Sequence, residues 1–331
     1  ALHSEYDRID EENYISVTGL MKPIRQIVLS KRVPLNQKQN DVEDFVASAI
    51  GTALHDSIER AWTRGHKHSL RLLGYPEDMI NRVLINPTDE QLAAVEHPIP
   101  IYMEQREIKQ IDGYSVGGKF DMIAEGILHD RKSTTAYTWL FGGKDGDYQL
   151  QGSLYRWLNQ KKITEDFIRI GFIFTDWQKM QALSNPKYPP ERLMTKDIPL
   201  LSVAETENWV KNKLSQITKF KNAPENTIPE CTDEELWKSD NQYKYYADPT
   251  KTLRATKNFD DYTEARKFMA EKGGKGIILS AGNRSSVVIK AGVPGVYLLR
   301  SLPVKISQNA VLPGDVLAKI VVISGNKGKV R

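Results

Sequence analysis

Two aspartates and a lysine stand close together in the apolar stretch GGKFDMIAEGILHDRKSTT, residues 117–135: Asp121, Asp130 and Lys132. Carboxylate oxygens are the ligands that Mg²⁺ and Mn²⁺ prefer. A neighbouring ammonium group can orient an attacking water or stabilise the charge that develops on a phosphate. The three side chains therefore predict a divalent metal site that cuts nucleic acid. For an isolated D-x-K, the commoner explanation is a surface ion pair of Lys132 with an aspartate.

The sequence between the two aspartates predicts a β-hairpin that brings them together. Gly126 supports a two-residue loop, although Glu125 is an imperfect residue at its first position. Such a loop places Asp121 directly opposite Asp130, with Cβ atoms roughly 5 Å apart, and Lys132 projects from the same face. Opposed carboxylates destabilise a half-buried sheet and raise the pKa of one of them. A bound cation removes this penalty.

Two predicted helices carry further candidate residues. Residues 41–65 show the clearest helical pattern, and His55 lies near small residues that let this helix approach a sheet closely. A neutral imidazole is a good ligand for Mn²⁺, although a lone helical histidine is more often solvated or satisfied by neighbours. Residues 145–161 predict a second helix with Gln151 and Tyr155 one turn apart. Their amide and phenol can donate to a phosphate or sugar, and the alternative is a buried tyrosine with a polar neighbour.

The other patterns predict an α/β chain. The Asp112-Gly113 turn joins two strand patterns as a hairpin, and further strand patterns follow it. The strand patterns cover residues 99–110, 114–125, 126–134 and 167–177. Residues 14–33 are predicted to be extended and then helical, residues 65–70 to form a basic turn, and residues 200–222 to form an amphipathic helix.

A change in composition predicts a domain boundary near residue 245. Residues 1–245 are expected to form the core with its N-terminal helical part. Residues 246–331 are expected to form a small α+β region of unknown role, with one helix at 259–274 and short strands after it. This region could cap a nucleic-acid channel, mediate oligomerisation or bind a partner protein.

Composition excludes several kinds of site. The single cysteine, Cys231, rules out an internal disulfide, a four-thiolate zinc site and a four-cysteine iron–sulfur cluster. No run of eighteen apolar residues exists, so we expect no membrane span, and the acidic N-terminal residues show no signal peptide. A reducing cytoplasm fits this composition. The net charge of +4 permits a polyanionic partner without requiring one.

The order of these motifs resembles the PD-(D/E)XK nuclease superfamily, and within it the RecB-like branch. The matching features are His55, a G-x-x-D from Gly118 to Asp121, a D-x-K from Asp130 to Lys132, and a Q-x-x-x-Y at Gln151 and Tyr155. The segment SVTGL at residues 16–20 is similar to the S-x-T-x-L segment of that branch, and residues 237–269 resemble the tail of phage-encoded exonucleases. The resemblance covers residues 14–175 and extends more loosely to about residue 270.

The resemblance implies a restriction-endonuclease-like α/β core, with a central mixed β-sheet flanked by helices. It also implies one or two Mg²⁺ or Mn²⁺ ions held by His55, Asp121, Asp130 and the backbone carbonyl of Arg131. Lys132 would position or help activate the attacking water, and Gln151 and Tyr155 would orient that lysine or the DNA strand. Two departures matter. Only eight residues separate the two aspartates, and the four cysteines of an iron–sulfur cluster are absent, so no such cluster is expected.

Contacts to DNA should follow basic and aromatic side chains. Trp139 or Phe141 could stack on a base, and core packing is the alternative for each. Any single basic residue is more often a solvated surface charge than a contact. The basic candidates are Arg131, Lys144, Arg156, Lys211, Lys213, Lys219 and Lys221, with Lys327, Lys329 and Arg331 in the tail.

Together with the predicted metal site, the resemblance implies a metal-dependent DNA exonuclease in phage or host recombination, replication or repair. It would act in the cytoplasm and could work with a recombination or replication protein. The alternatives are a structure-specific endonuclease of the same fold and a non-catalytic DNA-binding or assembly subunit. No motif of a nucleotide-triphosphate loop, a zinc peptidase or a serine hydrolase is present.

Overall fold

The computed structural model describes most of the chain and groups it into two compact units. The first unit comprises residues 1–22 and 40–222, and the second comprises residues 23–39 and 223–331. The domain boundary expected after residue 245 stays a prediction. The described residues are 9, 11, 13–33, 42–142, 144–232, 234–235, 242–281, 287–289 and 298–300.

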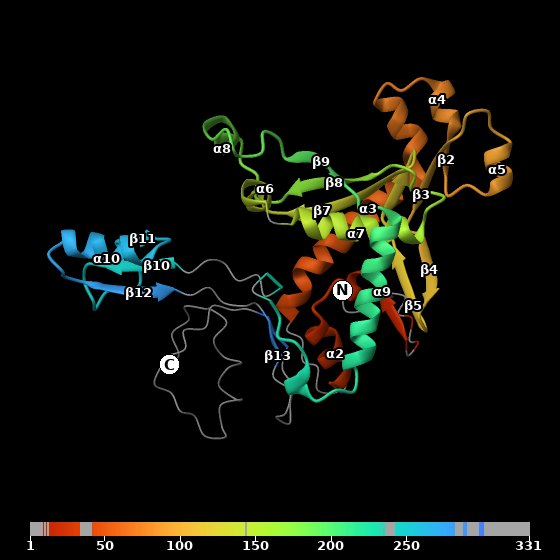
Figure 1. Ribbon diagram of the computed structural model, residues 1–331. Coiled ribbons are helices and arrows are strands. Elements are labelled where there is room, and N and C mark those ends of the chain that lie inside the picture. Colours follow the sequence, from red (N-terminus) through yellow and green to blue (C-terminus); the bar gives the residue numbers. More distant parts are fainter. Residues whose placement is uncertain are drawn as a thin grey trace. The chain divides into compact units, whose positions relative to one another are not determined.

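A six-stranded mixed sheet forms the centre of the first unit (Figure 1), in the order β2-β3-β6-β7-β8-β9. β2 pairs with β3, and β7 with β8, in parallel, whereas the other neighbours are antiparallel. The predicted α/β class with a mixed central sheet is confirmed. The strands are β2 (Val83–Ile85), β3 (Ile99–Met103), β6 (Met122–Ala124), β7 (Ile127–Thr134), β8 (Phe167–Phe174) and β9 (Leu193–Pro199).

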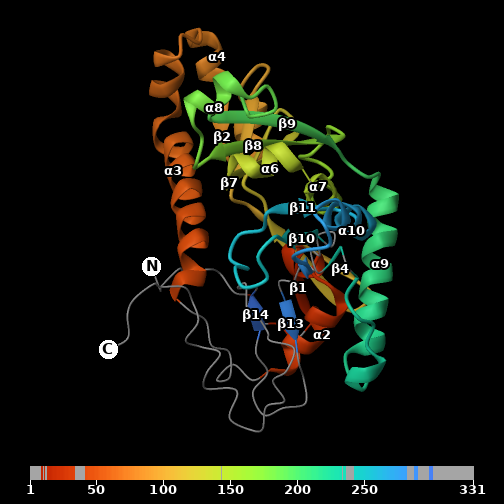
Figure 2. The same ribbon diagram turned by 90° about the vertical axis from the view of Figure 1, so that its left-hand side faces the viewer.

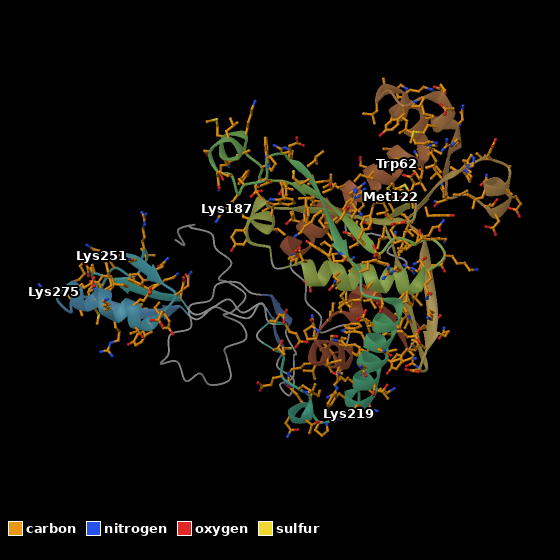
Figure 3. All side chains as sticks on the ribbon, turned by 45° about the horizontal axis from the view of Figure 1, so that its top comes forward. Trp62, Met122, Lys187, Lys219, Lys251 and Lys275 are labelled. Atoms are coloured by element: carbon orange, nitrogen blue, oxygen red, sulfur yellow. The ribbon has the colours of Figure 1, made fainter. Side chains whose placement is uncertain are left out.

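Helices cover both faces of this sheet (Figures 1 and 2). On one face, α3 (Val42–Leu72) packs Ile58 and Trp62 against a cluster that includes Met122; Figure 3 labels Trp62 and Met122. On the other face lies α7 (Asp145–Leu158). A Cβ atom at Gly152 of α7 would lie 3.0 Å from Cβ of Ile168 on β8, so only glycine permits this close approach of helix and strand.

The helix α3 is longer than the sequence predicts. The basic turn expected at residues 65–70 is wrong, because the helix continues through it to Leu72. Glycine at position 65 costs a helix about 1 kcal/mol. Trp62 and Leu70, on either side of Gly65, both pack on the sheet, and this burial outweighs the local preference. Among the residues that the structure describes, no helix, α3 included, is long and apolar enough to cross a membrane.

Both predicted tight turns are present. Asp112 and Gly113 have φ values of 50° and 78°, and Glu125 and Gly126 have 50° and 80°. Positive φ at both loop positions is the conformation that a two-residue hairpin with the correct twist requires. The second turn pairs Met122 with His129, which is the register expected between the two aspartate-bearing strands.

The expected long strands at 99–110 and 114–125 are each broken in two. Their outer parts leave the central sheet as β4 (Arg106–Ile111) and β5 (Tyr114–Lys119) and form a second sheet with β1 (Tyr14–Ser16), in the order β1-β5-β4. The first break is at Glu104, whose φ of 52° cannot continue a strand. The second break is at Phe120-Asp121. Asp121 therefore lies at a bend between two sheets.

Shorter helices complete the first unit. The helix expected at 200–222 is α9, and it begins with a capping box of Ser202 and Glu205. The predicted helical part of residues 14–33 is divided into α1 and α2, and α2 belongs to the second unit. The bounds are α1 (Val17–Leu20), α4 (Glu77–Arg82), α5 (Asp89–Ala93), α6 (Ala136–Phe141), α8 (Lys179–Ser184) and α9 (Val203–Phe220).

In the second unit, residues 242–281 form a small α+β fold with its own core. A three-stranded antiparallel sheet in the order β11-β10-β12 packs against α10 through Tyr245, Phe259 and Ala265. The elements of this unit are α2 (Ile24–Arg32), the 3-10 helix η2 (Glu225–Thr227), β10 (Gln242–Tyr246), β11 (Lys257–Phe259), α10 (Tyr262–Glu271), β12 (Ile277–Ala281), β13 (Val287–Ile289) and β14 (Leu298–Arg300).

Glu207 of α9 predicts a pH dependence of folding stability. Its carboxylate accepts from Trp157 Nε1 at 3.0 Å and pairs with Lys211 at 2.9 Å and Lys109 at 3.2 Å, which lowers the pKa of Glu207 to about 2. A lowered pKa stabilises the fold above the unfolded value near 4.5, and this contribution is lost as the pH falls from about 4.5 to 2. We expect Glu207→Gln to lose part of the fall in melting temperature that the wild type shows between pH 5 and 2.5, measured by circular dichroism. Equal acid sensitivity of both proteins would contradict this assignment.

Candidate metal centre

Asp121 occupies the bend between β5 and β6, and its position exposes an edge of β7. β6 pairs with β7 only up to His129, so the next residues of β7 are not paired with β6 on that side. The carboxylate of Asp121 uses this edge, because its Oδ2 accepts from the backbone N–H of Arg131 at 3.3 Å. The same Oδ2 lies 3.3 Å from Nδ1 of His55.

His55 reaches this edge from α3. Its Nε2 lies 3.2 Å from the carbonyl oxygen of Arg131, so three of the predicted metal ligands meet at one point: His55, Asp121 and the Arg131 carbonyl. Both ring nitrogens face acceptors, and the imidazolium form satisfies both. The hydrogen bond with Asp121 accordingly raises the pKa of His55. Metal binding would replace the proton on the ring.

Glu104 is a further acidic residue of this site that sequence reasoning missed. One ligand atom each of His55, Glu104 and Asp121 lies within 4.8 Å of the other two. Burial raises the pKa of Glu104, although Lys119 Nζ lies only 2.5 Å from its Oε2. A signal for it exists in the sequence. The register of the Asp112-Gly113 hairpin, continued inward, places Glu104 opposite Asp121.

Asp130 and Lys132 lie side by side on the β7 face that α7 covers. Asp130 is 5% exposed, and its Oδ2 lies 2.7 Å from Lys132 Nζ. Gln151 of α7 contacts both, donating to Asp130 Oδ1 at 3.3 Å and accepting from Lys132 at 3.4 Å. Burial raises the pKa of Asp130 well above its usual range. Among the described residues, Asp130 does not belong to the group of potential metal ligands formed by His55, Glu104 and Asp121. Its carboxylate is paired with Lys132 instead.

Tyr155 supports the strand that leads to Asp121. Its hydroxyl donates to the carbonyl oxygen of Lys119 at 3.0 Å, two residues before the aspartate. The Tyr155 ring covers Gly118: a Cβ atom there would lie 2.7 Å from Tyr155 Cε1 and 2.7 Å from Val17 Cγ2. This contact explains why the first position of the G-x-x-D motif is a glycine. The expected roles of Gln151 and Tyr155 in orienting DNA stay predictions.

We expect Gly118→Ala to disturb the site through this contact. The added methyl group must push away Tyr155 or β5, and overpacking of this kind costs typically about 1–3 kcal/mol. The melting temperature should therefore fall. Gly146→Ala on α7 is the control, since a Cβ atom there meets nothing within 4 Å and alanine favours a helix. If both variants behave like the wild type, Gly118 does not set the position of the bend.

The residues present fit a hard divalent cation. The donors are carboxylates, a backbone carbonyl and an imidazole, which suit Mg²⁺ and Mn²⁺, and no thiolate is among them. A hollow opens at this point, lined by His55, Ile58, Met103, Glu104, Asp121, Met122 and Arg131. The like charges of Glu104 and Asp121 are partly balanced by Lys119, and a cation would balance them further.

Several candidates for DNA contact make contacts within the fold. The guanidinium of Arg131 lies over Gly171 of β8, on the face away from Asp130 and Lys132. Arg156 donates to the carbonyl oxygens of Leu201 and Glu165. Their contacts with DNA stay predictions. Of the others, Lys211 pairs with Glu207, Lys213 and Lys219 lie near the rings of Trp209 and Phe220, and Lys144 and Lys221 are exposed.

Trp139 and Phe141 are the two aromatic candidates for base stacking. Trp139 packs edge-on against Phe172 and Phe174, at ring distances of 5.8 and 6.0 Å, which favours the core-packing alternative. The side chain of Phe141 lies outside the described residues, as do Lys327, Lys329 and Arg331.

Comparisons with known proteins give only distant structural likenesses. No family model matches this chain. No curated protein matches it. Among solved structures, the chain is similar to SSO0001 at 16% identity and a TM-score of 0.39, covering 66% of this chain and 80% of the other.

Two further likenesses are to proteins named as exonucleases. One is a candidate exonuclease from Eubacterium rectale, with 15% identity, a TM-score of 0.34, and coverage of 63% of this chain and 82% of that one. The other is a phage-related exonuclease from Haemophilus somnus 129PT, with 13% identity, a TM-score of 0.26, and coverage of 60% and 92%.

Proposed function

We propose that this chain is a deoxyribonuclease that depends on Mg²⁺ or Mn²⁺ and degrades DNA from its ends. One observation carries the proposal: His55, Asp121 and the Arg131 carbonyl converge at the free edge of β7, next to the Asp130–Lys132 pair. Metal-assisted phosphodiester hydrolysis needs two parts. One is an acidic cluster that would bind a metal, and the other is a half-buried lysine beside it.

Each residue of the site would have a distinct task. His55, Glu104, Asp121, Asp130 and the Arg131 carbonyl would hold one or two ions. A bound ion polarises the phosphate and lowers the pKa of a bound water. Lys132 would orient the attacking water and stabilise the charge on the phosphate oxygens. Gln151 would keep Lys132 beside Asp130 through its two contacts.

The acidic cluster also favours catalysis over binding alone. The carboxylates of Glu104 and Asp121 repel each other and would repel DNA phosphates, so a non-catalytic DNA-binding or assembly subunit would gain nothing from them. A metal ion changes both repulsions into attractions. The resemblance of residues 237–269 to the tail of phage-encoded exonucleases supports a role in phage or host recombination, replication or repair.

The test is a cleavage assay on three DNA forms. End-labelled linear duplex, linear single strand and covalently closed circular DNA are incubated with Mg²⁺, with Mn²⁺ or with EDTA. We expect metal-dependent loss of linear DNA only. Cleavage of the closed circle would make the protein an endonuclease with the same site. DNA binding without cleavage under either metal would contradict the catalytic proposal and leave a binding subunit.

A further inference from the structure

Charge is strongly segregated along this chain. Residues 1–241 contain 30 lysines and arginines against 36 aspartates and glutamates, whereas residues 242–331 contain 16 against 6. The part with the candidate metal centre is therefore net negative, and the positive net charge of the protein comes from its last quarter. A net negative enzyme that acts on DNA needs a separate source of attraction to phosphates.

Part of this basic segment is the small fold of residues 242–281. Eight of its 40 residues are lysine or arginine and five are aspartate or glutamate. Within this described stretch, only Lys251 makes an ion pair, with Asp248 at 3.4 Å on the surface. In the first unit, by contrast, basic residues are often paired, as in Lys109–Glu207, Lys162–Glu107 and Arg169–Asp197.

Three of these lysines gather at one end of the small fold. Lys257 Nζ lies 4.7 Å and Lys272 Nζ lies 5.4 Å from the centre of the same ring, that of Phe268. The backbone of Lys275 is close by, because its carbonyl oxygen accepts from Tyr245, whose ring contacts Phe268 at 5.3 Å. Figure 3 labels Lys275 on this fold. We call Lys257, Lys272 and Lys275 the lysine cluster.

The backbone holds the lysine cluster in place. Lys257 is paired with Tyr245 across β10 and β11. Lys272 follows the last turn of α10, whose end attracts cations, and the chain then turns sharply through Gly273 and Gly274 at positive φ. All three lysines are exposed, and among the described residues none of them has a carboxylate partner.

We propose that the lysine cluster is a DNA-binding surface separate from the candidate metal centre, and that it contacts the phosphate backbone. Exposed ammonium groups without carboxylate partners bind phosphates through release of counterions, with little dependence on base sequence. The surface would recruit the polyanion that the net negative residues 1–241 repel. The choice of DNA as the ligand rests on the proposed function, but the test reads binding alone, so a failure of binding and a failure of cleavage are distinguished.

The experiment compares three full-length proteins. One is the wild type, one carries Lys257→Gln, Lys272→Gln and Lys275→Gln, and one carries arginine at the same three positions as the matched control. Binding to a labelled duplex is measured by fluorescence anisotropy in EDTA, over a range of salt concentrations. EDTA prevents cleavage, so binding and catalysis are read separately.

We expect the glutamine variant to bind DNA at least roughly tenfold more weakly near 100 mM salt, with a slope of log affinity against log salt reduced by about two to three. The arginine variant should keep both the affinity and the slope of the wild type. Metal-dependent hydrolysis of bis(p-nitrophenyl) phosphate, a diester without a polyanionic chain, should be the same in all three proteins if the metal centre is active.

Unchanged affinity and slope in the glutamine variant would overturn the proposal, and the basic end would then suit an acidic protein partner instead. Equal melting temperatures of the three proteins exclude misfolding as the reason for a loss. A fourth variant, with glutamine at Lys272 alone, should lower the slope by about one and keeps the proposal testable if the triple variant does not fold. If the glutamine variant loses DNA binding and the wild type does not cut DNA, the result supports this surface and contradicts the proposed function.

Discussion

Replacement of Lys132 by alanine is expected to abolish cleavage of linear DNA, with a loss of about 10²–10³-fold or more in rate. The ammonium group lies 2.7 Å from Asp130, is held by Gln151, and is 28% exposed at the site. It is thus positioned to act on a phosphate beside the acidic cluster. The rate is measured on end-labelled duplex with saturating Mg²⁺ or Mn²⁺, and DNA binding is measured in EDTA to show that the substrate still binds.

Lys162→Ala is the matched control for this prediction. Lys162 is 26% exposed and pairs with Glu107 at 3.1 Å, so it resembles Lys132 in burial and pairing, and its ammonium contacts Gln105 and Glu107, neither of which is a proposed metal ligand. We expect it to cut DNA at the wild-type rate. A Lys132→Ala protein that also cuts at the wild-type rate would reduce this lysine to the partner of a buried aspartate, the commoner explanation of a D-x-K pattern.

The two hairpins show what the sequence can predict. Asp112-Gly113 and Glu125-Gly126 are local signals, since a two-residue loop fixes the pairing of every residue in its strands. The register found between β6 and β7 is the one that the second turn requires. The same arithmetic on the first turn would have indicated Glu104. The D-x-K pattern points only to the second turn, so Glu104 was not among the predicted ligands.

The breaks in the strands could not be predicted in the same way. The apolar alternation of Ile99, Ile101 and Met103 ends before Glu104, but the positive φ at Glu104 and the bend at Asp121 are what divide one hairpin between two sheets. The bend depends on contacts from distant parts of the chain, including Tyr155 on α7 and Val17 on α1 packed against Gly118. Tertiary packing of this kind leaves no local pattern, so the sequence predicted neither the bend at Asp121 nor the free edge of β7.

The basic residues show the same difference between pattern and packing. Arg156 looks like an exposed cation in the sequence but donates to two backbone carbonyls, whereas the pair of Lys211 with Glu207 lies within one helix at a spacing of four residues that the sequence shows. An ion pair depends on which acidic residue comes near in space, and sequence spacing reveals that only within one helix. The lysine cluster is defined by the absence of carboxylate partners among the described residues, and the sequence alone does not show which cations are paired.

Replacement of Asp121 by asparagine is expected to remove most of the affinity for the metal. Its Oδ2 is the atom at which His55 and the Arg131 N–H meet, and the carboxylate of Glu104 is close to it. Asparagine keeps the size and one acceptor oxygen but lacks the negative charge that a divalent cation requires. Loss of affinity should be at least roughly tenfold to a hundredfold, the range found even for residues that only support metal ligands.

Binding of Mn²⁺ by the Asp121→Asn protein can be followed directly by electron paramagnetic resonance of the free ion, without any assay of cleavage. Asp197→Asn is the control, because Asp197 is an acidic residue of the same unit whose partner is Arg169 at 2.7 Å. It should bind Mn²⁺ like the wild type. Because asparagine removes a negative charge that DNA phosphates would meet, the Asp121 variant should bind DNA in EDTA at least as tightly as the wild type. Wild-type affinity for Mn²⁺ in this variant would show that the ion is held elsewhere, and the metal centre at the bend would be wrong.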